Sequence, residues 1–392
     1  MESLRITHNT LLKERTSAIR RGLLDQIDKS SRLIAVKGSR GVGKTNFLLD
    51  YCREYYGDDD TCLYVNINNL FIASEGLYNF AGRFYKLGGK VLLLDQVHKY
   101  PGWDKELRAC YDDFSDLQIV FTASSIVRIK SNEYLQGKVD MYNLSGLSFR
   151  EFLELETGCR FPVFTFDEIV TDHEKIVGEI VKLVRPLAHF NNYLKYGYYP
   201  IYLEQKSHID YLLKNINLTL EFDIPYNSQI DLKYLTKLKK LLYIVAKENN
   251  SNVNISKLST EIGVSRATIQ NYLYYMKNAR LLTLLYDSDS DDDCGKKPNK
   301  LYIHNPNLLN AVCLDDVDAR MLRKIFFLSQ LCPVCQINYS ERADFRIDGK
   351  YDICVRGEKE KGRVPSSAVI MEDMIEQGKG NVIPLWLSGF VY

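Results

Sequence analysis

Short apolar runs alternate with helical spacing over the first 150 residues of the chain. Buried strands are predicted where Val, Ile, Leu and Phe cluster, at residues 33–37, 62–67, 91–94 and 118–122. Between these runs, apolar positions recur at the three- and four-residue spacing of helices, at residues 44–56, 77–87 and 103–114. Strands that alternate with helices predict βαβ units and a parallel sheet.

The pattern changes after residue 150. Residues 150–230 lose the strand signals and predict helices, with a loop or turn at the tyrosine-rich stretch 193–202. Residues 232–247 predict one more helix, and strand-like runs return after residue 321, which indicates a small α/β unit. An acidic run at residues 287–293 predicts a solvated loop.

Composition narrows the class of protein. A chain of 392 residues is longer than one hydrophobic core usually covers, which indicates more than one domain. Its 45% apolar and 26% charged residues are typical of soluble globular proteins. With 51 basic and 50 acidic residues the net charge is +1, which excludes a globally basic nucleic-acid binder but leaves room for a local basic patch. Nine irregularly spaced cysteines and the lack of a signal-like or membrane-spanning apolar stretch predict a cytoplasmic protein with reduced thiols.

A phosphate-binding loop follows the first predicted strand. The motif G-x-x-x-x-G-K-[ST] is complete and opens a helix, with residues Gly38, Ser39, Arg40, Gly41, Val42, Gly43, Lys44 and Thr45. Its glycines let successive N–H groups point at phosphate oxygens, and the helix start adds its positive dipole end. Lys44 is expected to bridge the β- and γ-phosphates of ATP, and Thr45 to bind Mg²⁺.

An acidic residue is needed near this loop to support the metal ion. Asp95, at the end of the buried run 91–94 on a neighbouring strand, is the candidate. Many ATPases of this class place a glutamate next, but this chain has Gln96. An amide can orient water but cannot accept its proton, so hydrolysis is expected to be slower by about 10²–10⁴-fold while ATP and Mg²⁺ still bind.

Hydroxyl groups end the fourth predicted strand. Thr122 and Ser124 would lie near the γ-phosphate and sense the state of the nucleotide, although Ser and Thr at a strand end also cap helices. His98 follows Asp95 by three residues, and we expect it to lie near the site without touching the substrate.

Residues 254–273 have the pattern of a helix-turn-helix. Asn254 and Ser265 would cap its two helices, Gly263 would form the turn, and residues 281–286 and 301–303 would be wing strands. A second helix in a major groove would present Arg266, Thr268, Gln270 and Asn271 to DNA. The acidic run in the wing is unfavourable for DNA, so a lid or a protein-binding module is the alternative.

Several of these stretches together resemble the prokaryotic AAA+-type ATPases that carry a C-terminal domain of unknown function. The resemblance is carried by GSRGVGKTNFLL, GGKVLLLDQVHKYPGW, DLQIVFTASS, LSGLSFREFLEL, HFNNYLKYGYYPIY and GNVIPLWLSGFVY, and it spans nearly the whole chain. It implies an α/β fold with four parts. These are a P-loop core with a parallel sheet at residues 1–150, a helical lid at 151–230, a winged helix-turn-helix at 231–305 and a nuclease-like α/β domain at 306–392.

The chain departs from that family at several positions. Ala123 replaces a glycine, and Lys138 replaces an arginine that would contact the γ-phosphate bound by a neighbouring subunit. Arg150 is present and would act either in the site or in an ion pair with Glu151 or Glu154. In the C-terminal unit Asp344 could be a metal ligand, but Cys354 and Glu358 replace the expected Glu and Lys, which indicates a degenerate nuclease. The lone C-x-x-C at residues 332–335 gives weak support for zinc.

The sequence therefore predicts an ATP- and Mg²⁺-binding ATPase that acts as a slow, nucleotide-dependent conformational switch. The alternative is a non-hydrolysing, ATP-dependent module that binds DNA or protein through the winged helix. A residual nuclease is a third possibility, against which Cys354 and Glu358 argue. We expect no membrane partner, and oligomerisation is left open.

Overall fold

The computed structural model describes residues 1–204, 208–248, 252–287, 295–313, 317–357, 360 and 365–392. Most of the expected acidic loop, residues 288–293, and Glu358 lie outside these described residues. Within the described part, contacts divide the chain into two compact units, Met1–Ser145 and Gly146–Tyr392. We call them the N-terminal unit and the C-terminal unit.

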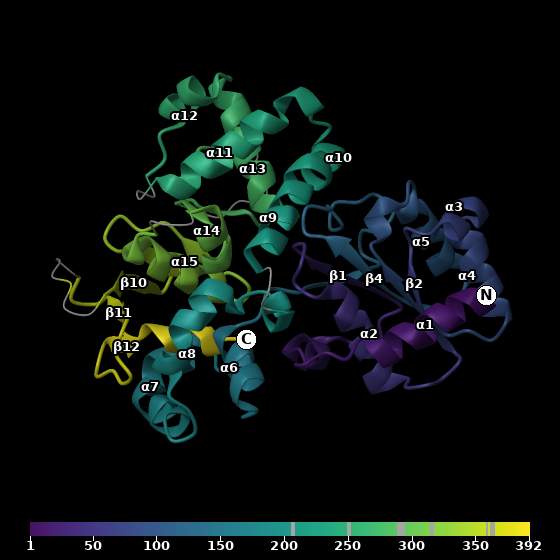
Figure 1. The fold of residues 1–392 in the computed structure, drawn as a ribbon, viewed down its shortest axis with the longest axis horizontal. Helices are drawn as coiled ribbons and strands as arrows, with labels where there is room; N and C mark the ends of the chain where they lie inside the picture. The colour runs from purple at the N-terminus through teal and green to yellow at the C-terminus, as the bar shows by residue number, and fades with distance from the viewer. Residues whose placement is uncertain (205–207, 249–251, 288–294, 314–316, 358–359, 361–364) are drawn as a thin grey trace. The chain divides into compact units, whose positions relative to one another are not determined.

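A five-stranded, fully parallel sheet forms the centre of the N-terminal unit (Figure 1). Its strand order is β2-β3-β4-β1-β5. The strands are β1 (Leu33–Gly38), β2 (Cys62–Asn66), β3 (Val91–Asp95), β4 (Gln118–Ser124) and β5 (Asp140–Asn143). The four predicted strands are confirmed. Because all strands are parallel, Gly38, Asp95 and Ser124 end at one edge of the sheet.

Asp95 was expected on a strand next to the P-loop strand. The strand that carries it, β3, does not pair with β1. β4 pairs with β1 on one side and with β3 on the other, so it lies between the P-loop strand and the Asp95 strand. The β-strand pattern gives composition and length but not the order of strands in a sheet. Thr122, on β4, therefore lies between the P-loop strand and the strand that carries Asp95.

Helices cover this sheet. The three predicted helices are confirmed as α2 (Lys44–Tyr55), α4 (Leu77–Lys86) and α5 (Trp103–Asp113), and two short helices are added, α3 (Leu70–Glu75) and η2 (Val97–Lys99). The sequence analysis did not predict α1 (Glu2–Glu14) or η1 (Gly22–Gln26). α1 packs against β2 (Figure 1). There the buried His8 accepts the main-chain N–H of Tyr64 through Nδ1 at 2.9 Å.

The C-terminal unit begins with helices, as predicted. They are α6 (Phe149–Thr157), α7 (Phe166–Ile180), α8 (Pro186–Asn192), α9 (His208–Leu218) and α10 (Ile224–Ser228), with a π-helical turn at Thr219–Asp223. α6 and α7 each start with a complete capping box, in which Ser148 pairs with Glu151 and Thr165 with Glu168. These reciprocal bonds satisfy the first N–H groups and fix where each helix begins.

The loop or turn predicted at residues 193–202 is confirmed only at Tyr198 and Tyr199, which form a turn and a bend. This stretch forms a π-helical turn at Tyr193–Gly197 and a 3₁₀-helix at Pro200–Glu204. Clustered tyrosines and a Gly suggested a turn, but Tyr193 and Tyr198 are fully buried. Burial of these large rings, which the local pattern could not reveal, keeps the segment helical.

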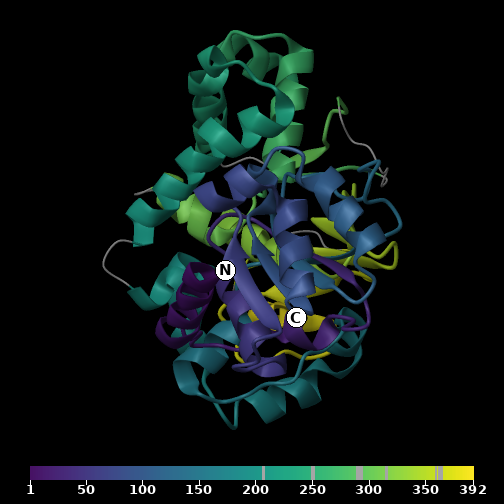
Figure 2. The ribbon, with the colours of Figure 1, turned by 90° about the vertical axis from the view of Figure 1, so that its right-hand side faces the viewer.

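The helix-turn-helix elements form as expected. α11 (Leu235–Lys247), preceded by η6 (Leu232–Tyr234), is followed by α12 (Ile255–Ile262) and α13 (Arg266–Asn278), the green helices at the top of Figures 1 and 2. Asn254 and Ser265 cap α12 and α13, and Gly263 has a φ of 70° in the turn. β6 (Leu282–Leu285) and β7 (Lys300–Ile303) then pair antiparallel.

The predicted α/β region at the end of the chain is also present. α14 (Pro306–Val312) and α15 (Ala319–Leu331) precede a mixed five-stranded sheet of order β12-β11-β10-β9-β8. Its strands are β8 (Ile337–Asn338), β9 (Phe345–Ile347), β10 (Tyr351–Arg356), β11 (Val369–Glu372) and β12 (Val382–Pro384), and η7 (Leu385–Phe390) follows.

One aromatic cluster joins the first and last parts of the C-terminal unit. The ring of Phe149 on α6 contacts Phe190 on α8, Tyr193, Phe326 on α15 and Phe390 on η7, with centroids 5.2 to 6.5 Å apart. Most contacts are edge-to-face, the geometry that aromatic quadrupoles favour. The expected lid and the expected C-terminal domain therefore share one core.

Two buried histidines should make the C-terminal unit sensitive to acid. Burial lowers the pKa of His208 to about 4 and that of His304 to about 3. An unfolded histidine titrates near 6.5, so the unfolded state binds more protons below that pH. Stability should be full above pH 6.5 and fall as the pH drops toward 4, with about 3 kcal/mol lost for His208 alone. Urea unfolding followed between pH 7.5 and 4.5 measures this slope.

The variant His208→Phe is the control for that slope. His208 packs edge-on against Tyr196, and within the described part of the chain neither ring nitrogen has a hydrogen-bond partner, so a phenyl ring can replace it. Its unfolding should depend less steeply on pH than that of the wild type. Equal slopes for both proteins would contradict the assignment.

Candidate nucleotide-binding site

The loop between β1 and α2 has the backbone that its glycines predict. Gly41 and Gly43 have φ values of 91° and 94°, in the left-handed region where a side chain is strained. Gly38 has a different reason to be glycine, because a Cβ there would lie 2.5 Å from the carbonyl oxygen of Leu144. The loop is therefore closely packed as well as tightly turned.

Lys44 folds back over this loop. Its Nζ donates to the carbonyl oxygens of Gly38 and Ser39, both at 2.8 Å. These bonds hold the ammonium group over the curled main chain, at the start of α2, where the N–H groups of the first turn lack partners within the helix. A cation and unpaired N–H groups at one place are suited to an anion.

The Asp95 carboxylate lies at the same edge of the sheet and is almost fully buried, at 1% exposure. It accepts three hydroxyl groups. Thr45 Oγ1 donates at 2.7 Å and Tyr64 Oη at 3.0 Å to Oδ2, and Thr122 Oγ1 donates to Oδ1. A buried carboxylate needs such donors, because the loss of water is otherwise very costly.

Tyr64 is the member of this group that the sequence analysis missed. It lies within β2, in a run that reads as an ordinary buried strand. Burial, and secondly the neighbouring Asp95 charge, raise the pKa of its phenol, so it stays a donor. Pairing of Asn66 with Asp95 in register places Tyr64 near the strand end, but only the sheet order reveals this.

Gln96 has the unusual backbone of this site. Its φ is 62°, in the left-handed region that non-glycine residues seldom adopt. Its main-chain N–H donates to Thr122 Oγ1 at 2.9 Å, and Thr122 in turn donates to Asp95. The turn after β3 is thus tied to β4 through the threonine between them, and a strained backbone of this kind is often found at functional sites.

The four residues Thr122–Ser125 divide their polar groups among different neighbours. The Thr122 hydroxyl donates to Asp95, and the Ser124 N–H donates to His98 Nδ1 at 3.4 Å. The Ser125 N–H donates to the carbonyl oxygen of Gly38 at 3.1 Å. The Ser125 hydroxyl is buried and, among the described residues, has no hydrogen-bond partner. Ser125 lies beyond the end of β4, at the end of the hydroxyl-rich stretch 122–125 from which the sequence singled out Thr122 and Ser124.

His98 lies at the site as a neutral ring. Burial, and secondly the positive charges of Lys44, Lys99 and Arg40, lower its pKa to about 4 against the opposing effect of the Asp95 charge. Since its Nδ1 accepts the Ser124 N–H, its other nitrogen carries the proton. The ring therefore supports the end of β4 and is not an acid at neutral pH.

These residues fit a nucleoside triphosphate with a divalent cation. A lysine and helix-start N–H groups suit phosphate oxygens, and Thr45 with Asp95 offers the oxygen ligands that Mg²⁺ prefers. The orphan Ser125 hydroxyl adds a free donor beside the loop. The predicted residues Lys44, Thr45, Asp95, Gln96, Thr122 and Ser124 come together at one edge of the sheet.

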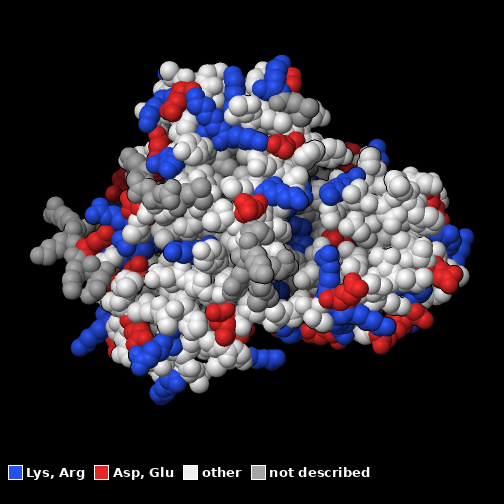
Figure 3. All heavy atoms as spheres, in the orientation of Figure 1, with Lys and Arg blue, Asp and Glu red and all other residues white. Residues whose placement is uncertain are grey.

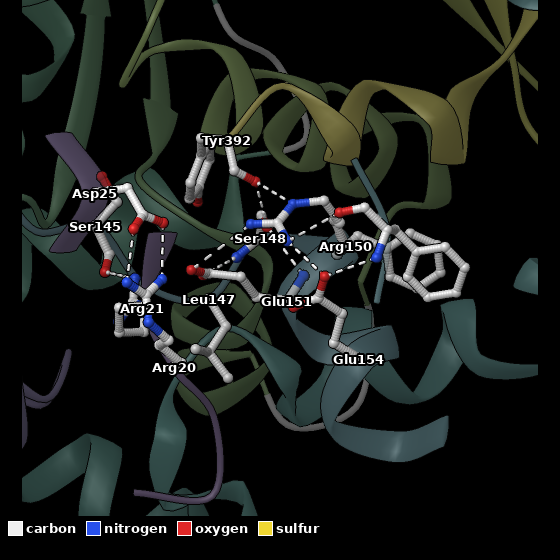
Figure 4. Close-up of polar contacts among 12 residues, drawn as sticks. Arg20, Arg21, Asp25, Ser145, Leu147, Ser148, Arg150, Glu151, Glu154 and Tyr392 are labelled. Atoms are coloured by element: carbon white, nitrogen blue, oxygen red, sulfur yellow. Dashed lines mark hydrogen bonds and ion pairs between the residues drawn. The ribbon is translucent and has the colours of Figure 1, made fainter. Parts of the chain in front are cut away.

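Two other candidates have contacts within their own units. Lys138 is exposed and its Nζ lies 5.5 Å from the centroid of the Tyr111 ring. Arg150, in the C-terminal unit, forms the ion pair that was one of its two predicted roles. Its Nη1 lies 2.7 Å from Glu154 Oε1, and Nε donates to the main-chain oxygen of Tyr392 at 3.0 Å (Figure 4).

In the helix-turn-helix, the four predicted DNA contacts differ in their surroundings. Arg266 is exposed at the start of α13, while the Thr268 hydroxyl is bonded to Ser265 at 2.8 Å. Gln270 and Asn271 are half-buried on the same helix. Figure 3 shows basic and acidic side chains interspersed on the visible face.

Asp344 in the C-terminal sheet is bonded within the protein. Lys324 Nζ lies 2.6 Å from its Oδ1, and the Val355 N–H donates to Oδ2 at 2.9 Å. Cys354 is a buried free thiol, and in the part of the chain that the structure covers no group of three His, Cys, Asp or Glu side chains could hold a metal. Across the same residues, no helix has the length and apolar character to span a membrane.

Comparison with known proteins finds two relatives in Methanocaldococcus jannaschii, both described as uncharacterized. One is 22% identical over 301 residues, 71% of this chain and 63% of the relative. The other is 25% identical over 270 residues, 65% of this chain and 56% of the relative. The matched stretch thus spans less than two thirds of either relative.

Among solved structures, AMPPCP-bound DnaA from Aquifex aeolicus matches 69% of this chain and 86% of its own, at 12% identity and a TM-score of 0.27. The replication initiator DnaA bound to AMPPCP and single-stranded DNA matches 70% and 86%, also at 12% identity and 0.27. Scores this low carry no argument about this chain.

The domain families are more informative. Residues 30–153 match the family described as AAA domain, which covers the sheet, the P-loop and Asp95. Residues 187–319 match a domain of unknown function, DUF8612. The chain therefore contains an AAA domain, which carries the P-loop, followed by a region that matches a domain of unknown function.

Proposed function

We propose that this protein is an ATP-dependent conformational switch that hydrolyses ATP slowly. The observation that carries the proposal is the pairing of Thr45, the last residue of the P-loop motif, with Asp95, at 2.7 Å. This bond brings together the two groups that an Mg²⁺–ATP complex requires of the protein. The AAA domain over residues 30–153 supports the same class of ligand.

Each residue of the site has a defined part in binding. Lys44 would exchange the carbonyl oxygens of Gly38 and Ser39 for phosphate oxygens, a stronger, charge-assisted bond. Thr45 and Asp95 would hold Mg²⁺, which neutralises charge on the phosphates when bound. Thr122 and Tyr64 keep the Asp95 carboxylate oriented at the edge of the sheet.

Gln96 sets the rate in this proposal. Its amide can orient a water molecule but has no site that takes up a proton at neutral pH. The turn that holds it, with a φ of 62°, resembles a preorganised position for a group that faces the nucleotide. Such a site would bind ATP firmly and release phosphate slowly, which favours a long-lived ATP state.

Ser125 is the candidate sensor of the γ-phosphate. Its N–H is bonded to Gly38 at the start of the P-loop, and its buried hydroxyl lacks a partner among the described residues. An unsatisfied buried hydroxyl costs free energy that a phosphate oxygen would recover. The Thr122 hydroxyl, in contrast, is committed to Asp95.

A non-hydrolysing module that binds DNA or protein is the second candidate function. The exposed Arg266 at the start of α13 favours it, because a basic side chain there could contact phosphate. Four further points stay predictions. They are the assignment of α11–α13 and β6–β7 as a winged helix, the four domain boundaries, a cytoplasmic location and oligomerisation.

The first prediction from the proposed function concerns Lys44. The variant Lys44→Ala should bind ATP about 100-fold more weakly, since hydrogen bonds to charged groups contribute on the order of 1.5–3 kcal/mol each. Isothermal titration calorimetry with Mg²⁺ and ATP measures the change. Lys90→Ala, which removes an exposed lysine, is the control and should bind as the wild type does. Equal affinity for all three proteins would argue against this site.

The second prediction concerns Gln96. Replacement by Glu supplies a proton acceptor and should raise steady-state phosphate release by about 10²-fold or more. Gln96→Asn, which keeps an amide, should leave release near the wild-type rate. If Glu, Asn and wild type release phosphate equally fast, Gln96 does not occupy the position of the base. If ATP binds but even Gln96→Glu releases none, the non-hydrolysing module is favoured.

The third prediction separates two serines. Ser125→Ala should weaken ATP binding by about 5- to 10-fold with little effect on ADP, because only the triphosphate would satisfy its hydroxyl. Ser124→Ala, next to it on β4, should change neither affinity. Competition between ATP and ADP for a fluorescent nucleotide measures both. An equal loss for the two variants would remove Ser125 as the sensor.

A further inference from the structure

Arg21 connects the P-loop to the last residue of the N-terminal unit. Arg21 is buried, at 7% exposure, just before η1. Nη1 donates to the carbonyl oxygen of Val42 in the P-loop at 3.1 Å. Nη2 donates to the carbonyl oxygen of Ser145 at 2.8 Å (Figure 4). One rigid, planar group thus holds two main-chain oxygens that lie 103 residues apart (145 − 42).

The segment before Ser145 is held to the same loop at two further points. The Leu144 N–H donates to the carbonyl oxygen of Lys37 at 2.7 Å, at the end of β1. The Leu144 carbonyl oxygen lies so close to Gly38 that a Cβ there would clash with it. A shift of the P-loop main chain therefore has to move residues 144–145 or break these contacts.

The chain that follows is held just as firmly within the C-terminal unit. The Leu147 N–H donates to the carbonyl oxygen of Tyr198 at 2.8 Å, and the Tyr193 hydroxyl donates to the carbonyl oxygen of Leu147 at 2.7 Å. A Cβ on Gly146 would clash with Tyr198. Ser148 then caps α6 and donates its hydroxyl to the main-chain oxygen of Tyr392 at 2.8 Å.

We propose that Arg21 is a positioning residue that couples occupancy of the P-loop to the C-terminal unit through residues 144–148. Only the Ser145–Gly146 peptide separates the two sets of contacts. The inference rests on the proposed function, since it needs a nucleotide to enter the P-loop. It goes beyond that function because it names the path by which the switch acts.

The source of the motion is the exchange at Lys44. In the structure, the ammonium group of Lys44 is bonded to the carbonyl oxygens of Gly38 and Ser39. Phosphate binding would release both carbonyls and draw the loop N–H groups toward the ligand. Val42 moves with the loop, and the guanidinium fork passes the shift to Ser145. Coupling of this kind requires that the two nucleotide states differ in these contacts.

The neighbouring Arg20 offers a matched control. It is also an arginine, but it is more exposed and bonds to Asp25 and Glu54 through side chains only. Arg20→Gln therefore removes the same charge from the same segment without touching the P-loop or Ser145. Exposed ion pairs of this kind contribute little to stability.

Hydrogen exchange of the full chain, with and without Mg²⁺ and ATP, tests the proposal. In the wild type, ATP should change exchange of amides in residues 146–152 and 193–198. Arg21→Gln should still bind ATP with an affinity within about tenfold of that of the wild type. The change in hydrogen exchange that ATP causes in those residues should be several-fold smaller, as expected when a coupling between two sites is lost. Arg20→Gln should keep the full response.

A second variant acts from the other side. Tyr193→Phe removes the hydroxyl bonded to Leu147 and lies in the C-terminal unit, so ATP affinity should be unchanged while the response in residues 146–152 shrinks. This variant decides the question if Arg21→Gln does not fold. A full response in a folded Arg21→Gln, or in Tyr193→Phe, would overturn the coupling.

The outcomes also separate this inference from the proposed function. If the wild type binds no ATP, the proposed function fails. If the wild type binds ATP but residues 146–152 and 193–198 do not respond, the coupling fails and nucleotide binding stands. A loss of response in Arg20→Gln equal to that in Arg21→Gln would show a general effect of charge and would also overturn the assignment to Arg21.

Discussion

The buried carboxylate of Asp95 is the constraint on which the candidate site depends. A charge at 1% exposure is tolerated only with strong donors around it, and it has three hydroxyl donors from β2, β4 and the start of α2. Meeting that requirement fixes the positions of β2, β4 and the start of α2 relative to β3, which carries Asp95. The same hydroxyls then fix Gln96, because Thr122 both donates to Asp95 and accepts from the Gln96 N–H. The hydrogen bonds that stabilise the buried charge therefore also set the geometry of the site.

Much of the N-terminal unit could be predicted from the sequence, because local signals there agree with the tertiary structure. Four apolar runs became strands with ends shifted by at most two residues, and the P-loop motif lies between the first strand and a helix. Asp95 and Thr122 could be selected because each lies at the end of a buried run. The helix caps at Asn254 and Ser265 were equally readable, since a cap depends on neighbours only three residues away.

Features that depend on distant residues could not be predicted. Tyr64 is an ordinary strand residue until the sheet order places it beside Asp95, and β5 has too few apolar positions to stand out. Tyr193 lies in a π-helical turn, and its ring is packed between Phe149 and Phe326, which are distant in the sequence. Arg21 and Arg20 are adjacent and chemically alike. Arg21 is buried and donates to main-chain oxygens, whereas Arg20 is exposed and forms ion pairs with carboxylates. Residue type alone cannot distinguish the two.

The aromatic cluster around Phe149 has a consequence for the order in which the chain folds. Phe149 and Phe390 are in contact although 241 residues separate them (390 − 149). On the ribosome, the N-terminal unit can close its sheet once β5 has emerged, because all five strands are then available. The core of the C-terminal unit has to wait for its last aromatic partner, with α6 and α8 exposing Phe149 and Phe190 meanwhile. During synthesis, the N-terminal unit would therefore be assembled before the C-terminal unit, whose unburied rings are a target for chaperones.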